Sequence, residues 1–258
     1  MKRYIKGSQQ KGREVMEEKF KESFIDFMID SGVLTFGDFQ TKSGRMSPYF
    51  INTGNYSTGE KISTLGSYYA KLIKKEVTPT ILESGNLCLF GPAYKGIPLV
   101  VASSSALYED FGIDLPYAFN RKEGKDHGEK GMIVGHSFQK GQSVLIIEDV
   151  VTAGTALREV VPFLMKQENV KIEGVIVSVD RMEKGIMGKS AVQEIQDEYG
   201  IPVFSLVTIR EVLEILRDKK DHKISSPLND ARISEDKAKI PDDKTINKIE
   251  AYLEKYGV

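Results

Sequence analysis

The stretch of the chain with the clearest chemical content is Ser143–Arg158, SVLIIEDVVTAGTALR. A short run of aliphatic residues, Val144–Ile147, ends in two adjacent carboxylates, Glu148 and Asp149. A turn of small and hydroxyl-bearing residues, Thr152–Thr155, follows them and leads into an expected helix. In open α/β sheets, ligands bind at the carboxyl ends of the strands. The pattern therefore predicts a ligand site where this strand ends.

The turn and the two acids suit different parts of one ligand. Backbone N–H groups in a small-residue turn, together with the positive end of a helix, bind a phosphate. Carboxylates accept hydrogen bonds from hydroxyls or hold a divalent metal. The segment lacks both the Gly-Lys-Ser/Thr ending of a Walker loop and the G-x-G-x-x-G of a dinucleotide site. One phosphate beside two acids favours a ribose 5-phosphate, although a capped helix after a core strand would leave a similar pattern.

The elements that must position this site alternate between short apolar strands and helices. Strands are expected at Leu87–Phe90, Tyr117–Asn120, Val144–Ile147, Ile172–Val179 and Val203–Val207. Helices are expected at Ile97–Tyr108, Thr155–Lys166 and Lys189–Tyr199. Strands that are apolar on both faces and alternate with helices are typical of a parallel sheet covered on both sides. The fold class is therefore α/β, with a mostly parallel central sheet flanked by helices.

The two ends of the chain are expected to add smaller elements. Apolar spacing predicts a helix over Arg13–Ser31, and weak alternation predicts a strand at Val33–Phe39 that leads into the Gly-, Ser- and Pro-rich segment Lys42–Gly59. A polar-capped helix is expected over Thr58–Lys75. The charged stretch Asp221–Asp243 has no clear period, which is typical of a solvated surface insertion. We expect one domain over residues 13–258, comprising an N-terminal helix and hood (13–60), a core (61–220), the insertion (221–243) and an amphipathic terminal helix (244–258).

The composition excludes several classes of protein. The 36 Lys and Arg residues nearly balance the 37 Asp and Glu residues, which argues against general nucleic-acid binding. The one cysteine, Cys88, excludes an intrachain disulfide and is expected in a core strand. No run approaches the ~18 apolar residues of a membrane span, and the basic N-terminus lacks the apolar region of a secretory signal. We therefore expect a soluble, cytoplasmic protein with neither nucleic acid nor membrane as a partner.

Five blocks of sequence resemble the orotate phosphoribosyltransferases, a family of type I phosphoribosyltransferases. The acid pair and its Thr-Ala-Gly-Thr turn match the signature of the wider group. The other blocks are KSGRMSPYFINTG (Lys42–Gly54), GPAYKGIPL (Gly91–Leu99), YAFNRKEGKDHGEKGMIVG (Tyr117–Gly135) and DRMEKG (Asp180–Gly185). They occur in the family's order between about Phe36 and Val207, and the final KIEAYLEKYGV is similar to its last helix.

This resemblance implies an enzyme that transfers the 5-phosphoribosyl group of phosphoribosyl pyrophosphate (PRPP) to N1 of orotate. The products would be orotidine 5′-monophosphate and pyrophosphate, in UMP biosynthesis. The implied cofactor is Mg²⁺, bound mainly through PRPP and pyrophosphate rather than at a metal site of the protein's own. By similarity, the acid pair binds the ribose hydroxyls and the turn binds the 5′-phosphate. The implied PRPP-binding residues here are Glu148, Asp149, Val150, Val151, Thr152, Ala153, Gly154, Thr155 and Ala156.

The resemblance also implies a set of cations for the pyrophosphate end of PRPP. These positions are Lys42, Tyr94, Lys95, Arg121, Lys122, Lys125 and His127. Negative charge grows on the leaving pyrophosphate, so donors already in place stabilise the transition state more than the ground state. We expect Lys125, Asp126 and His127 to be catalytic, with Lys125 foremost. The loop Arg121–Lys130 is expected to be mobile without ligand, to close over PRPP and to reach the neighbouring active site of a homodimer.

For the acceptor, the resemblance implies Phe50, Ile51, Thr152 and Arg181. Arg181 matches the family's orotate-binding arginine, and a guanidinium can grip a carboxylate or carbonyl edge with two parallel hydrogen bonds. The family often has a second Phe where this chain has Ile51, and Asp where it has Glu148. Ile51 in place of Phe would weaken a stacking contact with the base but not a backbone contact. Glu148 in place of Asp keeps the negative charge.

Two alternatives use the same fold. A different acceptor, such as a purine or another pyrimidine, is disfavoured by Arg181 and the SPYF segment, which fit orotate. A regulator that senses PRPP would not need the cationic loop and usually carries a DNA-binding module, which neither the basic tail nor Arg13–Ser31 resembles. Tyr69, Phe138 and Tyr199 are expected to serve packing or to lie on the surface.

Overall fold

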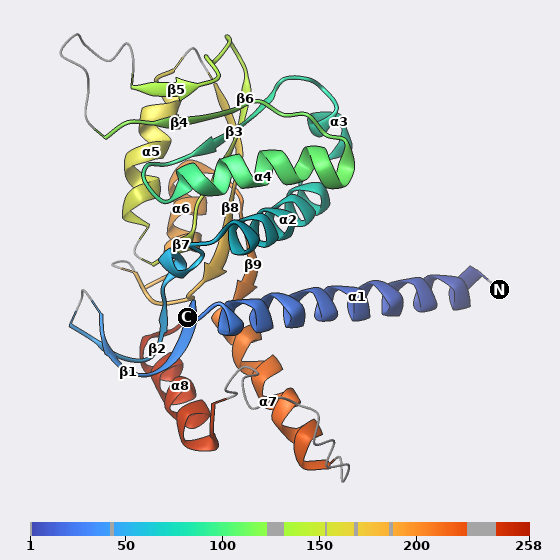
Figure 1. Cartoon of the computed structure of the whole chain (residues 1–258), viewed down its shortest axis with the longest axis vertical. Helices are drawn as coiled ribbons and strands as arrows, with labels where there is room; N and C mark the ends of the chain where they lie inside the picture. Colours follow the sequence, from blue (N-terminus) through green and yellow to red (C-terminus); the bar gives the residue numbers. More distant parts are fainter. Residues whose placement is uncertain are drawn as a thin grey trace. The chain divides into compact units, whose positions relative to one another are not determined.

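The computed structural model describes residues 2–41, 44–122, 132–152, 154–167, 170–185, 188–225 and 241–258, with side chains described from residue 15 on, excluding 220–225 (Figure 1). The chain divides into two compact units. The smaller unit comprises Met1–Asn55 and Ile209–Tyr252, and the larger comprises Tyr56–Thr208 and Leu253–Val258.

The larger unit is built on one seven-stranded sheet. Its strand order is β5-β4-β3-β6-β8-β7, and β9 also pairs with β8. The strands are β3 (Leu87–Gly91), β4 (Tyr117–Asn120), β5 (Ile133–Gly135), β6 (Ser143–Ile147), β7 (Val150–Val151), β8 (Lys171–Asp180) and β9 (Val203–Thr208). All pairs are parallel except β4 with β5. The predicted α/β class with a mostly parallel sheet is therefore confirmed.

Helices cover both faces of this sheet (Figure 1). Helices α2 (Gly59–Glu76) and α4 (Gly96–Phe111) pack on one face, and α5 (Thr155–Met165) and α6 (Ala191–Tyr199) on the other. A short α3 (Pro79–Leu82) follows α2. The Thr58 hydroxyl caps α2 by accepting from the Lys61 N–H at 3.3 Å, and Ser190 with Gln193 forms a capping box on α6. These local signals explain why the helices begin close to where the sequence predicts them.

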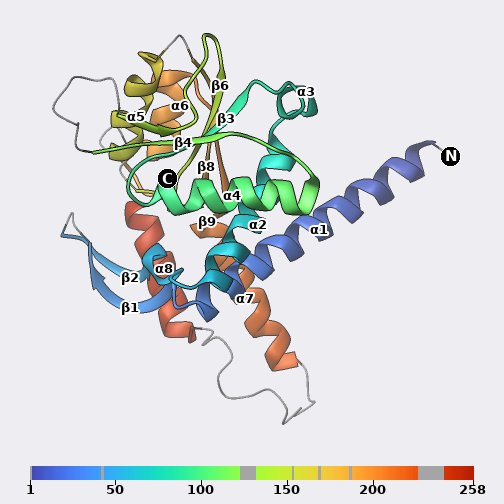
Figure 2. The same cartoon turned by 45° about the horizontal axis from the view of Figure 1, so that its top comes forward.

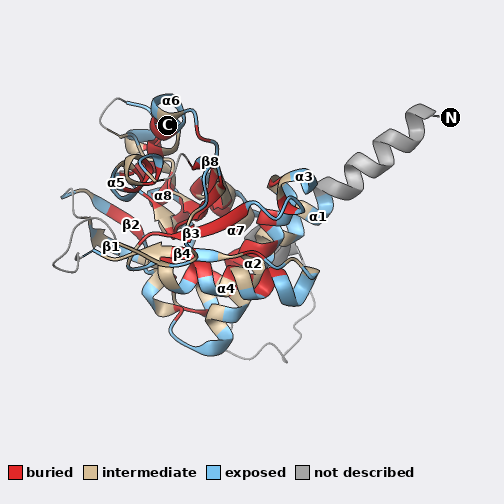
Figure 3. Cartoon of the chain, turned by 90° about the horizontal axis from the view of Figure 1, so that it is seen from above, coloured by how far each residue is buried: buried red, intermediate tan, exposed pale blue. Residues whose placement is uncertain are grey.

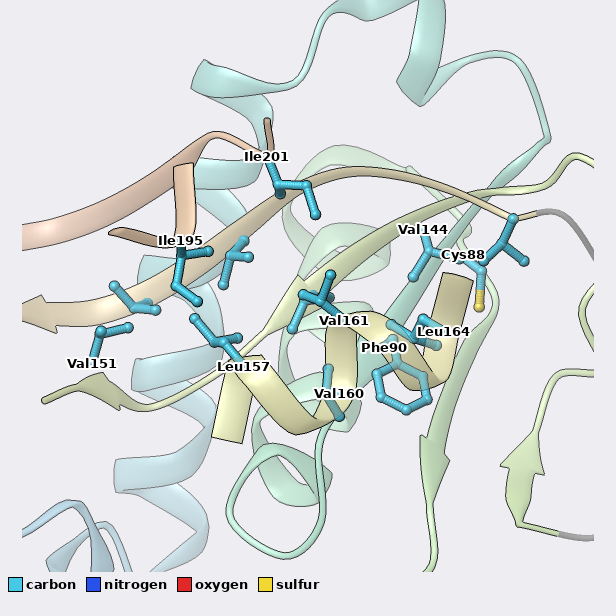
Figure 4. Packing of buried hydrophobic residues seen from close by; sticks show 14 of the residues in the cluster. Cys88, Phe90, Val144, Val151, Leu157, Val160, Val161, Leu164, Ile195 and Ile201 are labelled. Carbon is cyan, nitrogen blue, oxygen red and sulfur yellow. The ribbon is translucent and has the colours of Figure 1, made fainter. Parts of the chain in front are cut away.

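The core on the α5 and α6 face consists of alternate strand residues and the apolar sides of both helices (Figure 4). Because side chains alternate along a strand, Cys88 and Phe90 of β3 share this face with Val144 of β6. Figure 3 shows how completely β3 and the middle of β8 are buried. Cys88 is fully buried, as predicted, and burial raises the pKa of its thiol to about 12. Because a strand that is buried on both faces cannot shift, the position of the residues that follow it is fixed as well.

The smaller unit contains α1 (Lys2–Asp30), the antiparallel hairpin of β1 (Leu34–Gln40) and β2 (Met46–Ile51), a short η1 (Thr53–Asn55), α7 (Ile209–Ser225) and α8 (Asp243–Tyr256) as far as Tyr252 (Figure 2). Ion pairs join α1 to α7, with Lys21 Nζ 2.6 Å from Glu211 Oε1. The Tyr49 ring of β2 meets the Tyr252 ring of α8 edge-on, with centroids 6.0 Å apart.

Several predicted boundaries are wrong. Helix α1 begins at Lys2 rather than Arg13. The segment Lys42–Gly59 contains strand β2. Pro48 is tolerated in β2 because each strand of a two-stranded hairpin is an edge strand. Helix α7 was not predicted, although Val212, Leu213 and Leu216 form a buried stripe. It continues to Ser225, so the expected insertion begins as a helix, and its residues 226–240 lie outside the described residues. Strands β5 and β7 were missed because they have three and two residues.

Among the described residues, no helix combines the length and the apolar character that crossing a membrane requires.

Candidate active site

The acid pair lies directly after β6, where the buried strand ends. Glu148 and Asp149 are only 6% and 8% exposed. Their backbone is held by two other elements: the Tyr69 hydroxyl of α2 donates to the Glu148 carbonyl at 2.7 Å, and Ser178 of β8 donates to the Asp149 carbonyl from Oγ at 2.5 Å and from its N–H at 2.8 Å. The Glu148 N–H in turn donates to the Ile176 carbonyl at 2.9 Å. Hydrogen bonds from α2 and β8 therefore hold the backbone of the acid pair.

Two carboxyl groups share this buried site. Burial and the neighbouring Asp149 raise the pKa of Glu148 to about 8, although the Asp149 N–H donates to Glu148 Oε1 at 2.9 Å. Lys95 Nζ lies 2.7 Å from Asp149 Oδ2 and is the counter-charge of that carboxylate. Burial raises the pKa of Tyr69 well above its ordinary value, so its hydroxyl remains a donor. A site of this kind favours ligands that bring hydroxyl donors or a divalent cation.

The residues after the acids lead from β7 into the first turn of α5. Strand β7 pairs with β8, and the next residue, Thr152, is exposed. Helix α5 begins at Thr155, directly after Gly154, whose φ of +72° is a left-handed conformation that glycine adopts readily. A Cβ on Gly154 would lie 3.6 Å from side-chain atoms of Ala191 and Ile195, so the turn is backed by α6. The first N–H groups of an α-helix have no partners within the helix, and the N-terminal end of a helix stabilises an anion.

A second turn, Pro92–Gly96, follows β3 and carries Tyr94 and Lys95. The Ala93–Tyr94 peptide bond is cis, and the Ala93 N–H donates to Asn120 Oδ1 at 2.9 Å. Tyr94 is 62% exposed and the Lys95 side chain 64% exposed. A Cβ on Gly91 would lie 2.2 Å from the Gly96 carbonyl oxygen, so only glycine permits this approach between β3 and α4.

Two predicted cations, Arg121 and Lys122, follow β4, and Lys122 lies near the same turn. Lys122 Nζ is 5.3 Å from the centre of the Tyr94 ring, a cation–π contact. The Arg121 N–H donates to the Met132 carbonyl at 2.7 Å, extending the β4–β5 pairing. The structure therefore brings Tyr94 and Lys122 together, and separately joins Lys95 to the acid pair.

The expected acceptor residues fall in both units. Arg181 follows β8 directly and is 7% exposed, and its guanidinium is bonded to Glu183. Phe50 and Ile51 end β2 in the smaller unit, where the Phe50 ring stacks on Phe39 with centroids 5.4 Å apart. Five predicted site residues lie outside the described residues: Lys42, Lys125, Asp126, His127 and Ala153.

Three residues that contact the site were missed by sequence reasoning: Tyr69, Ser178 and Glu183. Tyr69 was expected to serve packing, and it is fully buried, but its hydroxyl bonds to the acid pair. The available signal was the hydroxyl group of Tyr69 and of Ser178, each in a segment expected to be buried, because buried polar groups form hydrogen bonds.

No group of three or more His, Cys, Asp or Glu side chains is placed to hold a metal ion in the part of the chain that the structure describes. The adjacent carboxylates of Glu148 and Asp149 can contribute ligands to a cation whose other ligands come from a substrate.

Comparison with known proteins extends these observations. A model of the phosphoribosyl transferase domain matches residues 67–206. The orotate phosphoribosyltransferase of Lachnoclostridium phytofermentans is 47% identical over 241 residues, covering 93% of this chain and 99% of that protein. That of Clostridium acetobutylicum is 45% identical, with the same coverage of 93% and 99%. The crystal structure of orotate phosphoribosyltransferase from Francisella tularensis has a TM-score of 0.72 at 38% identity, covering 92% of this chain and 100% of that one.

Proposed function

The chain belongs to the phosphoribosyltransferase family and, within it, to the orotate phosphoribosyltransferases, and on that premise we propose how its residues divide the work of the reaction. The enzyme transfers the 5-phosphoribosyl group of PRPP to N1 of orotate, giving orotidine 5′-monophosphate and pyrophosphate in pyrimidine biosynthesis. The observation that carries the assignment of roles is the buried acid pair joined to a small-residue turn at the end of β6.

In this proposal the ribose 5-phosphate lies along the segment Glu148–Ala156. Glu148 and Asp149 accept hydrogen bonds from the ribose hydroxyls, because both are buried acceptors at a strand end. Backbone N–H groups from Val150 to Ala156 and the Thr152 and Thr155 hydroxyls bind the 5′-phosphate at the start of α5. Thr152 also borders the acceptor. The rigidity of the acid pair supports this role, since a reacting ribose must be held in one orientation.

The cations surround the pyrophosphate in the proposal. Tyr94, Lys95, Arg121 and Lys122 contact it, and Lys95 exchanges its bond with Asp149 for one to a phosphate oxygen. Lys42 and the loop residues Lys125, Asp126 and His127, all outside the described residues, complete the set. As the bond to the anomeric carbon breaks, these donors stabilise the charge that develops on pyrophosphate. Lys125 has the largest catalytic role.

The proposed cofactor is Mg²⁺, which neutralises charge on the pyrophosphate. The residues present fit this ion, because Glu148 and Asp149 offer oxygen ligands and their mutual repulsion in a buried site favours a cation. Most of its ligands come from PRPP.

Orotate is bound by Arg181 through its carboxylate or carbonyl edge, and Phe50 and Ile51 border its ring. This assignment rests on the match of Arg181 to the family's arginine and on the position of Arg181 at a strand end, where ligands of such sheets bind.

The remaining proposals concern assembly. We infer a homodimer in which the Arg121–Lys130 loop reaches the partner subunit's site, and a single catalytic domain over residues 13–258. We also propose a cytoplasmic location.

The first experiment is a Mg²⁺-dependent assay with PRPP that offers orotate, uracil, adenine and hypoxanthine in parallel. We expect nucleotide and pyrophosphate from orotate alone. Product from another base would overturn the acceptor assignment, and PRPP binding without any product would point to a sensor.

The second experiment tests the catalytic loop. Lys125→Ala should lower kcat by about 10²–10³-fold, because a transition-state donor is lost, and the thermal unfolding temperature should not change. Near-normal turnover would remove Lys125 from this role. Mixing Lys125→Ala with Arg181→Ala subunits should restore part of the activity, and heterodimers that show no recovery would count against a shared site.

A further inference from the structure

The segment after β8, Asp180–Lys184, has an unusual backbone. Met182 has a φ of +49°, a left-handed conformation that residues with a Cβ seldom adopt. Its N–H donates to the Asp180 carboxylate, Oδ1, at 2.8 Å. Conformations of this kind persist only where surrounding contacts enforce them, and they concentrate at functional sites. The contacts that enforce this one therefore bear on what the segment does.

The last residues of the chain in the structure supply some of those contacts. The Lys184 N–H donates to the Tyr256 carbonyl at 2.7 Å, and the Val258 N–H donates to the Met182 carbonyl at 2.9 Å. Between them Glu183 and Gly257 form an antiparallel bridge. Both segments belong to the larger unit. This short ladder fixes the backbone on each side of Glu183.

The side chain of Glu183 then holds Arg181. Arg181 Nε and Nη2 both donate to Glu183 Oε1, at 2.9 and 2.5 Å. The two side chains are largely buried, at 8% and 12% exposed. Bonds between ionised groups are stronger than neutral ones, and two from one edge of a planar guanidinium stop it from rotating. A guanidinium has a second pair of donors on its Nη1–Nη2 edge, which suits a planar carboxylate or carbonyl.

We propose that Glu183 is a positioning residue for the acceptor, holding the Arg181 guanidinium in the orientation that binds the carboxylated pyrimidine. The inference rests on the proposed role of Arg181. It goes further because it makes the affinity for the acceptor depend on Glu183, which need not contact the acceptor. The ladder to Tyr256–Val258 keeps Glu183 where this bond can form.

The test is Glu183→Gln, which keeps the length of the side chain and an acceptor oxygen but removes the charge. We expect the orotate KM to rise about tenfold, because charge-assisted bonds contribute more than neutral ones. The PRPP KM should stay within about twofold, since the segment Glu148–Ala156 is untouched. Glu173→Gln is the matched control: Glu173 is a largely buried glutamate near the start of β8, paired with Lys171, and its variant should leave both KM values unchanged.

Each other outcome overturns the inference. An unchanged orotate KM means that Arg181 needs no positioning, and a lower one means that Glu183 competes with the acceptor for the guanidinium. An equal rise in both KM values, with a lower unfolding temperature, means a purely structural role. Arg181→Ala separates this failure from failure of the acceptor assignment. If Arg181→Ala leaves the orotate KM unchanged, the proposed acceptor site is wrong; if it raises that KM while Glu183→Gln does not, only the positioning role fails.

Discussion

The two turns that end β3 and β6 are neighbours in one sheet but differ in how they hold their charged groups. After β6, Glu148 and Asp149 are buried, and Tyr69 and Ser178 bind their carbonyls. After β3, Tyr94 and Lys95 are mostly exposed. The proposed ligand explains the difference. The ribose must be held in one orientation at its reacting carbon, so its binding residues are buried and fixed. The pyrophosphate is a polyanion, which long and exposed cationic side chains can bind.

This difference predicts that the charged side chains of the exposed turn contribute strongly to PRPP binding. Lys95→Met keeps the aliphatic stem and removes the charge. We expect the PRPP KM to rise about tenfold, because a phosphate loses a charge-assisted bond. The free energy of unfolding should fall by about 1–2 kcal/mol, between the values for an exposed and a buried ion pair, because Lys95 is exposed but its partner Asp149 is buried. Steady-state kinetics and thermal unfolding measure the two effects.

Lys171→Met is the control for Lys95→Met. Lys171 is also exposed and paired with a carboxylate, Glu173 Oε2, at 3.0 Å. Its variant should match the wild type in both KM values. A large loss of stability in Lys95→Met with an unchanged PRPP KM would reverse the contrast between the two turns.

A substitution that supports the buried turn should change PRPP binding less. Tyr69→Phe removes only the hydroxyl that donates to the Glu148 carbonyl. We expect the protein to lose about 1 kcal/mol of stability, the typical value of one hydrogen bond. The PRPP KM should rise only about threefold, because Ser178 still holds the next carbonyl, and the orotate KM should not change.

Ser103→Ala is the comparison for Tyr69→Phe. Ser103 is a buried residue of α4 whose hydroxyl has no hydrogen-bond partner among the described residues. Removing that hydroxyl should cost no stability. If Tyr69→Phe is as stable as Ser103→Ala, the bond to Glu148 contributes nothing to the acid pair.

A separate effect concerns pH. Burial, together with Asp149, raises the pKa of Glu148 from its ordinary 4.5 to about 8, so the folded protein holds this proton more tightly than the unfolded chain. The stabilisation is complete below about pH 4.5 and is lost as the pH rises to about 8. Glu148→Gln is neutral at every pH. The unfolding temperature of the wild type should therefore fall relative to that of Glu148→Gln between pH 5 and pH 8.5. If the unfolding temperatures of the two proteins change with pH in parallel, the pKa of Glu148 is not raised in the folded protein.

The sequence alone determined the elements that carry the site. Apolar runs alternating with helical spacing predicted the five longer strands of the central sheet and α2, α4, α5 and α6, because burial on both faces requires continuous apolar residues. The acid pair and the turn before α5 were found from residue types and spacing, since their chemistry lies within one continuous segment.

Only the tertiary structure decided which distant residues support that segment. Tyr69 lies 79 positions from Glu148 and Lys95 lies 54 from Asp149, and no local pattern connects them. The pairing of Glu183 with Gly257 depends likewise on where the chain's last residues pack. Periodicity reports which face of an element is apolar, but the partner of a single buried hydroxyl or carboxylate is set by how the elements pack, and packing is a property of the whole fold.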